Sequence, residues 1–125
     1  MRRRRLILLV EDDVALAHLY RGVLQMAGFE TVHVVDGWSA LRAMDERLPD
    51  LIVLDIHLPG LRGDELLAEM SQRPETRQIP AIVVTGADID LAVAQAKQIL
   101  RKPCDPERLV SVVERSSRNS FKKRR

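Results

Sequence analysis

Short apolar runs alternate along the chain with segments in which apolar residues recur every three or four positions. The runs are typical of strands buried on both faces of a sheet, and the spaced pattern is typical of helices packed along one side. The runs predict strands at residues 6–10, 31–35, 51–54, 81–84 and 99–100. The spaced segments predict helices from Val14 to the stop at Gly28, at residues 38–48 (with Leu41, Met44 and Leu48 inward), around Leu66, Leu67 and Met70, at residues 89–96, and from Asp105-Pro106 onward.

Five strand–helix units in succession predict a doubly wound α/β fold. Strands that alternate with amphipathic helices form a parallel sheet with helices on both faces, joined by right-handed crossovers. The chain has 125 residues, of which 46% are hydrophobic, which is enough for one domain with a substantial core. No apolar run is long enough to cross a bilayer, and we expect a cytoplasmic protein. A single cysteine, Cys104, excludes an internal disulfide, and the histidines lack zinc-ligand spacing.

Basic residues are concentrated at the two ends of the chain. Eight of the twenty Lys and Arg residues lie in the runs Arg2–Arg5 and Lys122–Arg125. The rest of the chain has twelve basic and eighteen acidic residues. We therefore expect a basic tail at residues 1–5, an acidic domain at residues 6–118 and a second basic tail at residues 119–125. The tails could contact nucleic acid, an anionic membrane or an acidic partner, or simply aid solubility. No helix-turn-helix pattern supports sequence-specific DNA binding.

Polar residues suited to phosphoryl chemistry follow the predicted strands. They are Glu11-Asp12-Asp13 after the first strand, Asp55 after the third, Thr85-Gly86 after the fourth and Lys102-Pro103 after the fifth. The carboxyl ends of parallel strands meet at one edge of the sheet, where such folds place their sites. Close carboxylates repel by roughly 4 kcal/mol per pair at a protein surface, so either protons or a cation must hold them together, and hard oxygen ligands suit Mg²⁺. Asp55 is then the candidate nucleophile, with charge stabilised by Thr85 and Lys102.

Four motifs, "LLVEDD", "VLDIHLPGLRGDELL", "VVTG" and "LRKP", occur in this order. Together they resemble the receiver domain of two-component response regulators, over residues 6–117. The resemblance implies a flavodoxin-like (βα)5 fold with strand order 2-1-3-4-5 and a cis Lys102–Pro103 peptide. It also implies the following site: Glu11, Asp12, Asp55 and the backbone carbonyl of His57 bind Mg²⁺, Asp55 accepts phosphate, and Thr85 and Lys102 contact the acyl phosphate.

The resemblance further implies a signalling domain and not an enzyme. Its phosphodonor would be a histidine kinase or a phosphotransfer protein, and it would signal to a downstream effector through protein contact. We expect a single-domain regulator, while homodimer formation and self-dephosphorylation stay open. Three features depart from the family pattern. Ile99 replaces an aromatic residue that swings inward on phosphorylation, the segment from Thr85 to Lys102 is roughly five residues short, and Cys104 replaces a common Phe.

Two other functions compete with phosphoacceptance. A phosphohydrolase of the haloacid dehalogenase type also uses a nucleophilic Asp with Mg²⁺, but it needs a second acid where this chain has His57. A pseudo-receiver would keep the fold as a binding module without cycling phosphate. Among other residues, we interpret His18 as a helix-surface residue and His33 as a strand-edge residue. We expect Trp38 to pack the second helix on the sheet.

Overall fold

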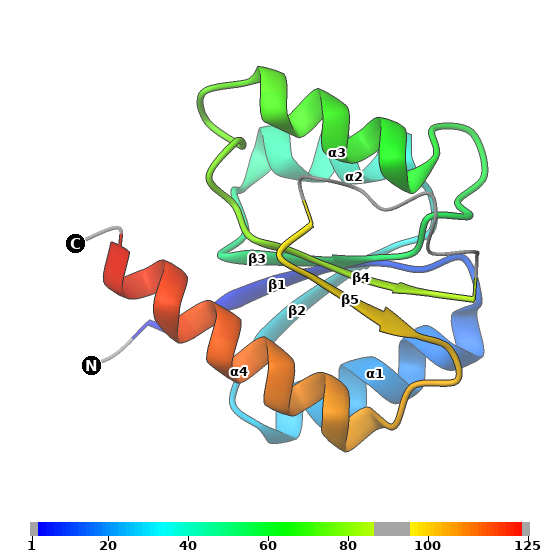
Figure 1. Cartoon of the computed structure of the whole chain (residues 1–125), viewed down its shortest axis with the longest axis vertical. Coiled ribbons are helices and arrows are strands. Elements are labelled where there is room, and N and C mark those ends of the chain that lie inside the picture. The colour runs from blue at the N-terminus through cyan, green and yellow to red at the C-terminus, as the bar shows by residue number, and fades with distance from the viewer. Residues whose placement is uncertain (1–2, 87–95, 124–125) are drawn as a thin grey trace.

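Five parallel strands form one sheet in the order β2-β1-β3-β4-β5 in the computed structural model, which describes residues 3–86 and 96–123 (Figure 1). The strands are β1 (Leu6–Val10), β2 (Glu30–Val34), β3 (Leu51–Leu54), β4 (Ala81–Thr85) and β5 (Gln98–Arg101). This arrangement confirms the predicted fold and strand order. The Lys102–Pro103 peptide bond is cis, as expected.

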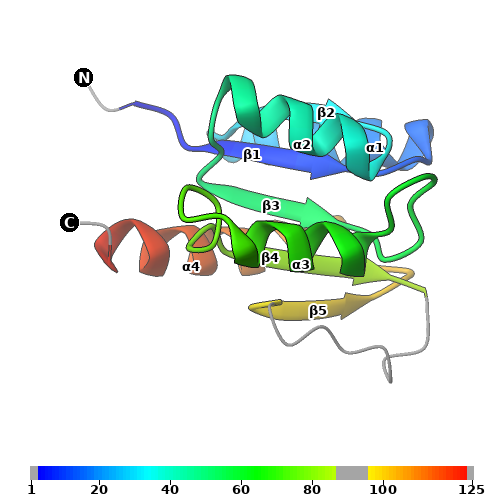
Figure 2. The same cartoon turned by 90° about the horizontal axis from the view of Figure 1, so that it is seen from above.

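Helices cover both faces of the sheet (Figures 1 and 2). Two of them, α1 (Val14–Met26) and α4 (Pro106–Lys123), lie on one face, and α2 (Gly37–Glu46) and α3 (Gly63–Gln72) lie on the other. The helix predicted over residues 89–96 lies, except for its last residue, outside the described residues. The other four predicted helices are confirmed.

The sheet separates two hydrophobic cores because neighbouring residues of a strand point to opposite faces. In β1, Leu8 and Val10 face the core beneath α2 and α3, whereas Ile7 and Leu9 face the core beneath α1 and α4. All residues of β1, β3 and β4 are buried. The continuous apolar runs in the sequence therefore correspond to strands covered on both sides.

Two apolar residues of the second predicted helix are not where the sequence pattern places them. The helix ends at Glu46, so Leu48 lies beyond it and is 40% exposed instead of facing the core. Trp38 is 54% exposed. A side chain added at Gly60 would lie 3.0 Å from its Cδ1 atom, so Trp38 lies against the loop that follows β3 and not on the sheet.

The amino ends of the strands are tied together near the chain termini. Asp50, just before β3, accepts hydrogen bonds from the Leu6 N–H at 2.7 Å and from the Arg3 guanidinium at 3.1 Å. Arg5 donates to the Ser117 hydroxyl of α4 at 3.0 Å. Two arginines of the N-terminal basic run thus have fixed partners in the domain.

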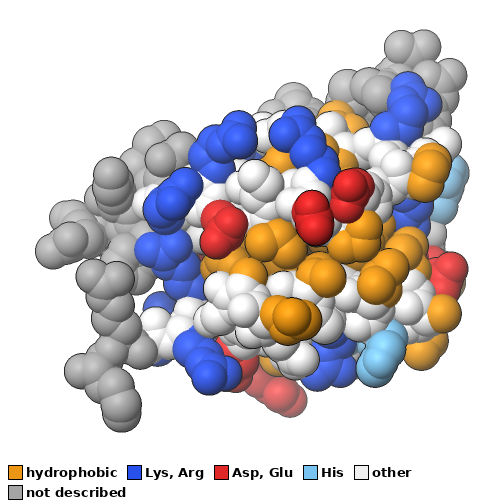
Figure 3. Space-filling view, turned by 90° about the horizontal axis from the view of Figure 1, so that it is seen from below, with side chains coloured by type: hydrophobic (Ala, Val, Ile, Leu, Met, Phe, Trp, Pro, Cys, Tyr) orange, Lys and Arg blue, Asp and Glu red, His pale blue; other side chains and the backbone are white. Residues whose placement is uncertain are grey.

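The face formed by α1 and α4 carries exposed apolar side chains. Figure 3 shows this face, with hydrophobic side chains gathered over its middle and many Lys and Arg side chains along its margins. On α1, the exposed large hydrophobic residues are Val14, Leu19 and Met26.

None of the helices in the described part of the chain has the length and hydrophobicity needed to span a membrane.

Candidate functional site

The predicted site residues meet at the carboxyl ends of the strands. Glu11 directly follows β1, Asp55 follows β3, and Lys102 follows β5. The backbone fixes these positions: the Asp55 N–H donates to the Val10 carbonyl at 3.4 Å, and the Lys102 N–H donates to the carbonyl of Thr85, the last residue of β4, at 2.9 Å. Parallel pairing therefore brings residues that are far apart in the sequence to one place.

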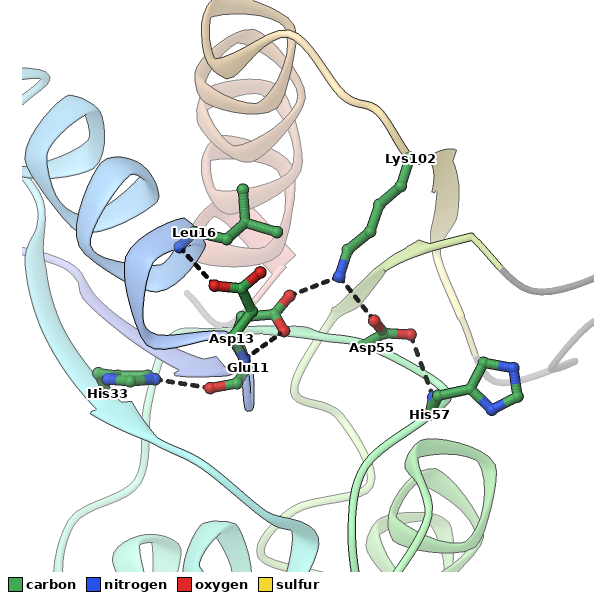
Figure 4. A network of polar contacts seen from close by, with 7 residues as sticks. All are labelled: Glu11, Asp13, Leu16, His33, Asp55, His57 and Lys102. Carbon is green, nitrogen blue, oxygen red and sulfur yellow. Dashed lines mark hydrogen bonds and ion pairs between the residues drawn. The ribbon is translucent and has the colours of Figure 1, made fainter.

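Lys102 joins two buried carboxylates (Figure 4). Its Nζ atom lies 2.7 Å from Oε1 of Glu11 and 2.7 Å from Oδ2 of Asp55. Burial by itself lowers the pKa of Lys102, but the hydrogen bonds to Asp55 and Glu11 outweigh burial and raise it to about 12. Lys102 is therefore a charged ammonium that holds together two groups that would otherwise repel each other.

The environment of Asp55 favours its ionised form. Burial raises the pKa of this carboxyl, but hydrogen bonds from Lys102 and Thr85 act against burial. The His57 N–H adds a further hydrogen bond to Oδ1 of Asp55, at 3.1 Å. The net result is a pKa below the ordinary value of 3.8, so Asp55 is a carboxylate at neutral pH and can act as a nucleophile.

The pKa of Glu11 is raised, although Glu11 shares the Lys102 ammonium with Asp55. Its burial raises the pKa by more than the hydrogen bonds from Lys102 and from the Asp13 N–H lower it. The Asp13 N–H donates to Oε2 of Glu11 at 3.0 Å. Both carboxylate oxygens of Glu11 are thus engaged within the domain.

Each residue of the acidic turn, defined as residues 11–13, has a different role. Glu11 points to Lys102, whereas Asp12 is exposed beside it. Asp13 caps α1, because its side chain accepts a hydrogen bond from the Leu16 N–H at 3.1 Å. The structure therefore brings Glu11, Asp55 and Lys102 into contact. Asp12 and His57 are exposed at the rim of this cluster.

One contact at the site was missed by the sequence analysis. Nε2 of His33, on β2, lies 2.8 Å from the backbone carbonyl oxygen of Glu11 (Figure 4). The pattern of residues 31–35 indicated a strand-edge position for His33 but gave no partner. Finding this contact from sequence requires the register that pairs Val10 with Val34.

The loop after Asp55 is packed closely against its surroundings. A Cβ atom on Gly63 would lie 2.1 Å from the Asp55 carbonyl oxygen, and one on Gly37 would lie 2.2 Å from the Leu61 carbonyl oxygen. Only glycine fits such approaches without a backbone shift. The first residues of α2 and α3 therefore hold the loop that carries the candidate nucleophile.

The oxygen donors at this edge fit Mg²⁺. The carboxylates of Glu11 and Asp55 carry two negative charges around one ammonium, with Asp12 nearby in the chain. Within residues 3–86 and 96–123, no three side chains of the types His, Cys, Asp and Glu form a ready-made metal site. Mg²⁺ needs no such cage, because it keeps several waters and commonly takes one or two carboxylates. The ligand roles of Glu11, Asp12, Asp55 and the His57 carbonyl stay predictions.

The chain matches a known protein family. The model of the response regulator receiver domain matches residues 7–114. The chain is 46% identical over 80 residues to the phosphate regulon transcriptional regulatory protein PhoB of Rhizobium meliloti, covering 64% of the chain and 35% of PhoB. It is 35% identical over 115 residues to the DNA-binding response regulator MtrA of Mycobacterium leprae, covering 88% of the chain and 50% of MtrA. The chain thus spans half or less of the length of these relatives.

Solved structures show the same similarity. A CheY-like response regulator receiver domain protein from Methanospirillum hungatei superposes with a TM-score of 0.88 at 27% identity, covering 97% of this chain and 99% of that chain. NtrX from Brucella abortus superposes with a TM-score of 0.86 at 34% identity, covering 98% of this chain and 28% of that chain. The similarity therefore extends over nearly the whole chain.

Proposed function

The chain belongs to the response regulator receiver domain family, and on this basis we propose that Asp55 accepts a phosphoryl group in a Mg²⁺-dependent transfer. Receiver domains are signalling domains that interact with histidine kinases and effectors. The donor that we propose is a histidine kinase or a phosphotransfer protein. The receiver unit is proposed to span residues 6–118, between the basic ends at residues 1–5 and 119–125.

The observation that carries the proposal is the ammonium of Lys102 between Glu11 and Asp55. In the transfer, a carboxylate oxygen of Asp55 forms a bond to phosphorus while the bond from phosphorus to the donor breaks, and the donor leaves with the electron pair. Lys102 is placed to stabilise negative charge on the phosphoryl oxygens. The Thr85 hydroxyl, already hydrogen-bonded to Asp55, can donate to the same oxygens.

Mg²⁺ would be held by the carboxylates of Glu11, Asp12 and Asp55 and by the backbone carbonyl of His57. When bound, the ion supplies positive charge that offsets the charge of the transferring group. The chain's own contribution is to keep Asp55 ionised and fixed, through Lys102 and through the His57 N–H.

Phosphorylation would add a charge of roughly −1.5 to −2 beside Lys102. We propose that Thr85 and Lys102 reorient toward this charge, which changes the surface offered to an effector protein. Ile99, where an aromatic residue is usual, is half-buried against the core beneath α2 and α3. In the proposed switch, this position therefore carries a smaller side chain than the common one. Val14, the exposed first residue of α1, directly follows the acidic turn and offers an apolar contact for the phosphodonor protein next to the site.

Two alternatives are distinguished by specific features of the site. A haloacid dehalogenase type phosphohydrolase would need a second acid two positions after Asp55, and that position is His57, which is exposed. A pseudo-receiver would bind partners without phosphate. The buried carboxylates Glu11 and Asp55 favour the phosphoacceptor, because burying them together is unfavourable without a function to keep them.

The test is intact-protein mass spectrometry after incubation with acetyl phosphate or phosphoramidate. The wild type and Asp55→Asn are compared with and without Mg²⁺. We expect one phosphate adduct that requires Mg²⁺ and is lost in the variant, because an amide cannot act as the nucleophile. The decay of the adduct then measures self-dephosphorylation. Absence of an adduct, with Mg²⁺ binding confirmed separately, would favour the pseudo-receiver, and an undiminished adduct in Asp55→Asn would place the acceptor elsewhere.

A further inference from the structure

His33 connects the edge strand of the sheet to the acidic turn. Its Nε2 atom lies 2.8 Å from the Glu11 carbonyl oxygen (Figure 4). A carbonyl oxygen only accepts hydrogen bonds, so Nε2 of His33 carries the proton in this contact. The contact comes from β2, a strand that carries none of the predicted site residues.

The direction of the His33 side chain follows from the strand on which it lies. Thr31, two residues earlier and therefore on the same face, accepts hydrogen bonds from Arg21 and Gln25 of α1, both at 3.2 Å. Val34 points to the other face and packs against the core beneath α2 and α3. His33 thus lies on the α1 side of the sheet, where the acidic turn leads from β1 into α1.

Glu11 is fixed by contacts at each of its polar groups. Its N–H donates to the Val34 carbonyl at 3.0 Å, its carbonyl accepts from His33, and its two carboxylate oxygens accept from Lys102 and from the Asp13 N–H. The Glu11 carbonyl belongs to the same rigid peptide plane as the Asp12 N–H. A hydrogen bond to that carbonyl therefore orients the backbone from which the Asp12 side chain extends.

We propose that His33 is a positioning residue for Mg²⁺ binding: its hydrogen bond to Glu11 sets the orientation of the Glu11–Asp12 peptide and so the placement of both carboxylates. The proposal rests on the proposed function, in which these two residues hold Mg²⁺. Groups that orient metal ligands without touching the metal typically contribute about 10- to 100-fold in affinity. We expect an effect near the lower end, because Glu11 keeps its other contacts.

The experiment compares variants that differ in whether they can donate this hydrogen bond. His33→Val removes the donor and keeps strand propensity, His33→Leu removes it with a different shape, and His33→Gln supplies an amide N–H at a similar reach. His18→Leu, which replaces an exposed histidine of α1, is the matched control. Circular dichroism establishes that each variant is folded under the conditions of the assay.

The main measurement is the dissociation constant of Mg²⁺ by titration calorimetry. We expect it to rise about tenfold in His33→Val and His33→Leu. It should return to within about threefold of the wild type in His33→Gln and stay unchanged in His18→Leu. Equal affinities in the wild type, His33→Val and His33→Leu would overturn the proposal, as would weak binding in the Gln variant equal to that of the Val variant.

A second measurement is independent of the metal. In the metal-free protein, the ¹⁵N chemical shift of the Asp12 amide should change in His33→Val more than in His33→Gln, because that amide shares the peptide plane of the Glu11 carbonyl. An unchanged shift in His33→Val would contradict the positioning role. If the wild type itself binds no Mg²⁺, the metal part of the proposed function fails and this proposal fails with it. If the wild type binds and all variants bind equally, only the role of His33 is lost.

Discussion

Two buried aspartates stand at opposite ends of β3 and differ in what surrounds them. Asp50, before the strand, is 5% exposed, and Asp55, after it, is 7% exposed. Both contact a basic side chain, Arg3 in the first case and Lys102 in the second. Asp50 also accepts from the Leu6 N–H, and its own N–H donates to the Leu6 carbonyl at 2.8 Å. It joins the starts of two neighbouring strands.

The difference lies in the charge around each aspartate. The Lys102 ammonium is shared by Asp55 and Glu11, which leaves negative charge in excess at that end of the sheet, whereas Asp50 is the carboxylate that Arg3 contacts at the other end. Excess negative charge favours a further cation, and with it a phosphoryl group. Burial and an ion pair alone therefore do not identify a reactive aspartate.

Removing the shared ammonium should have the largest effect. In Lys102→Ala, Glu11 and Asp55 would face each other without Lys102, and one of the hydrogen bonds that lower the pKa of Asp55 would be lost. We expect the rate of phosphorylation by acetyl phosphate to fall by about 100-fold or more. Lys97→Ala, at an exposed lysine, is the control. A rate in Lys102→Ala within twofold of the control would show that the shared cation is not needed.

Crowding the loop at Asp55 should disturb both folding and chemistry. A Cβ at Gly63 would lie 2.1 Å from the Asp55 carbonyl oxygen, so Gly63→Ala should lower the free energy of unfolding by about 1–3 kcal/mol and slow phosphorylation. In Gly22→Ala, within α1, the new Cβ meets no described atom within 4 Å, and stability should rise by about 0.5–1 kcal/mol. Chemical denaturation and adduct formation are measured on both. Equal behaviour of the two variants would contradict the close packing.

At the other end of β3, a substitution should lower stability without slowing phosphorylation. Asp50→Ala leaves the Leu6 N–H without this acceptor and should cost about 1–3 kcal/mol of unfolding free energy, while phosphorylation of the folded protein stays at the wild-type rate. Asp45→Ala, at an exposed aspartate, should change stability by less than about 1 kcal/mol. If Asp50→Ala abolished the adduct in folded protein, the contrast between the two aspartates would be wrong.

Asp36, the residue before α2, has a capping role and gives the smallest expected effect. Asp36 accepts a hydrogen bond from the Ser39 N–H at 2.7 Å, and this bond lowers its pKa below the ordinary 3.8. The charged cap therefore stabilises the fold fully above the ordinary pKa of an aspartate. This stabilisation is lost as the pH falls through the folded-state pKa of Asp36. Asp36→Ala should cost about 1 kcal/mol at neutral pH. The difference from the wild type should shrink in strong acid; a difference that is constant with pH would exclude a charged cap.

Much of the fold was predictable because apolar runs mark the buried strands directly. The prediction for β3 coincides with the observed residues 51–54, where every position is buried. Leu48 was placed wrongly because it continues the helical spacing of Leu41 and Met44, although the helix ends at Glu46. Periodicity indicates which residues share a face, but it does not show where a helix stops.

At the site, the sequence predicted which residues gather but not how they pair. Asp55 and Lys102 could be placed together because both follow parallel strands. That Glu11, and not Asp12, shares the ammonium depends on the direction of the turn after β1. The contact of His33 depends in addition on the register of β2 against β1. Such contacts arise between strands, and a single sequence carries no direct signal for them.

The central claim, that Asp55 is the phosphoacceptor, is tested most directly by locating the phosphorylated residue. Borohydride reduces an aspartyl phosphate to homoserine, which marks the acceptor permanently for peptide sequencing by mass spectrometry. After incubation of the wild type with phosphoramidate and Mg²⁺, we expect homoserine at position 55 and unmodified aspartate at positions 12, 13 and 50. Homoserine at any of those three positions, with Asp55 intact, would contradict the account.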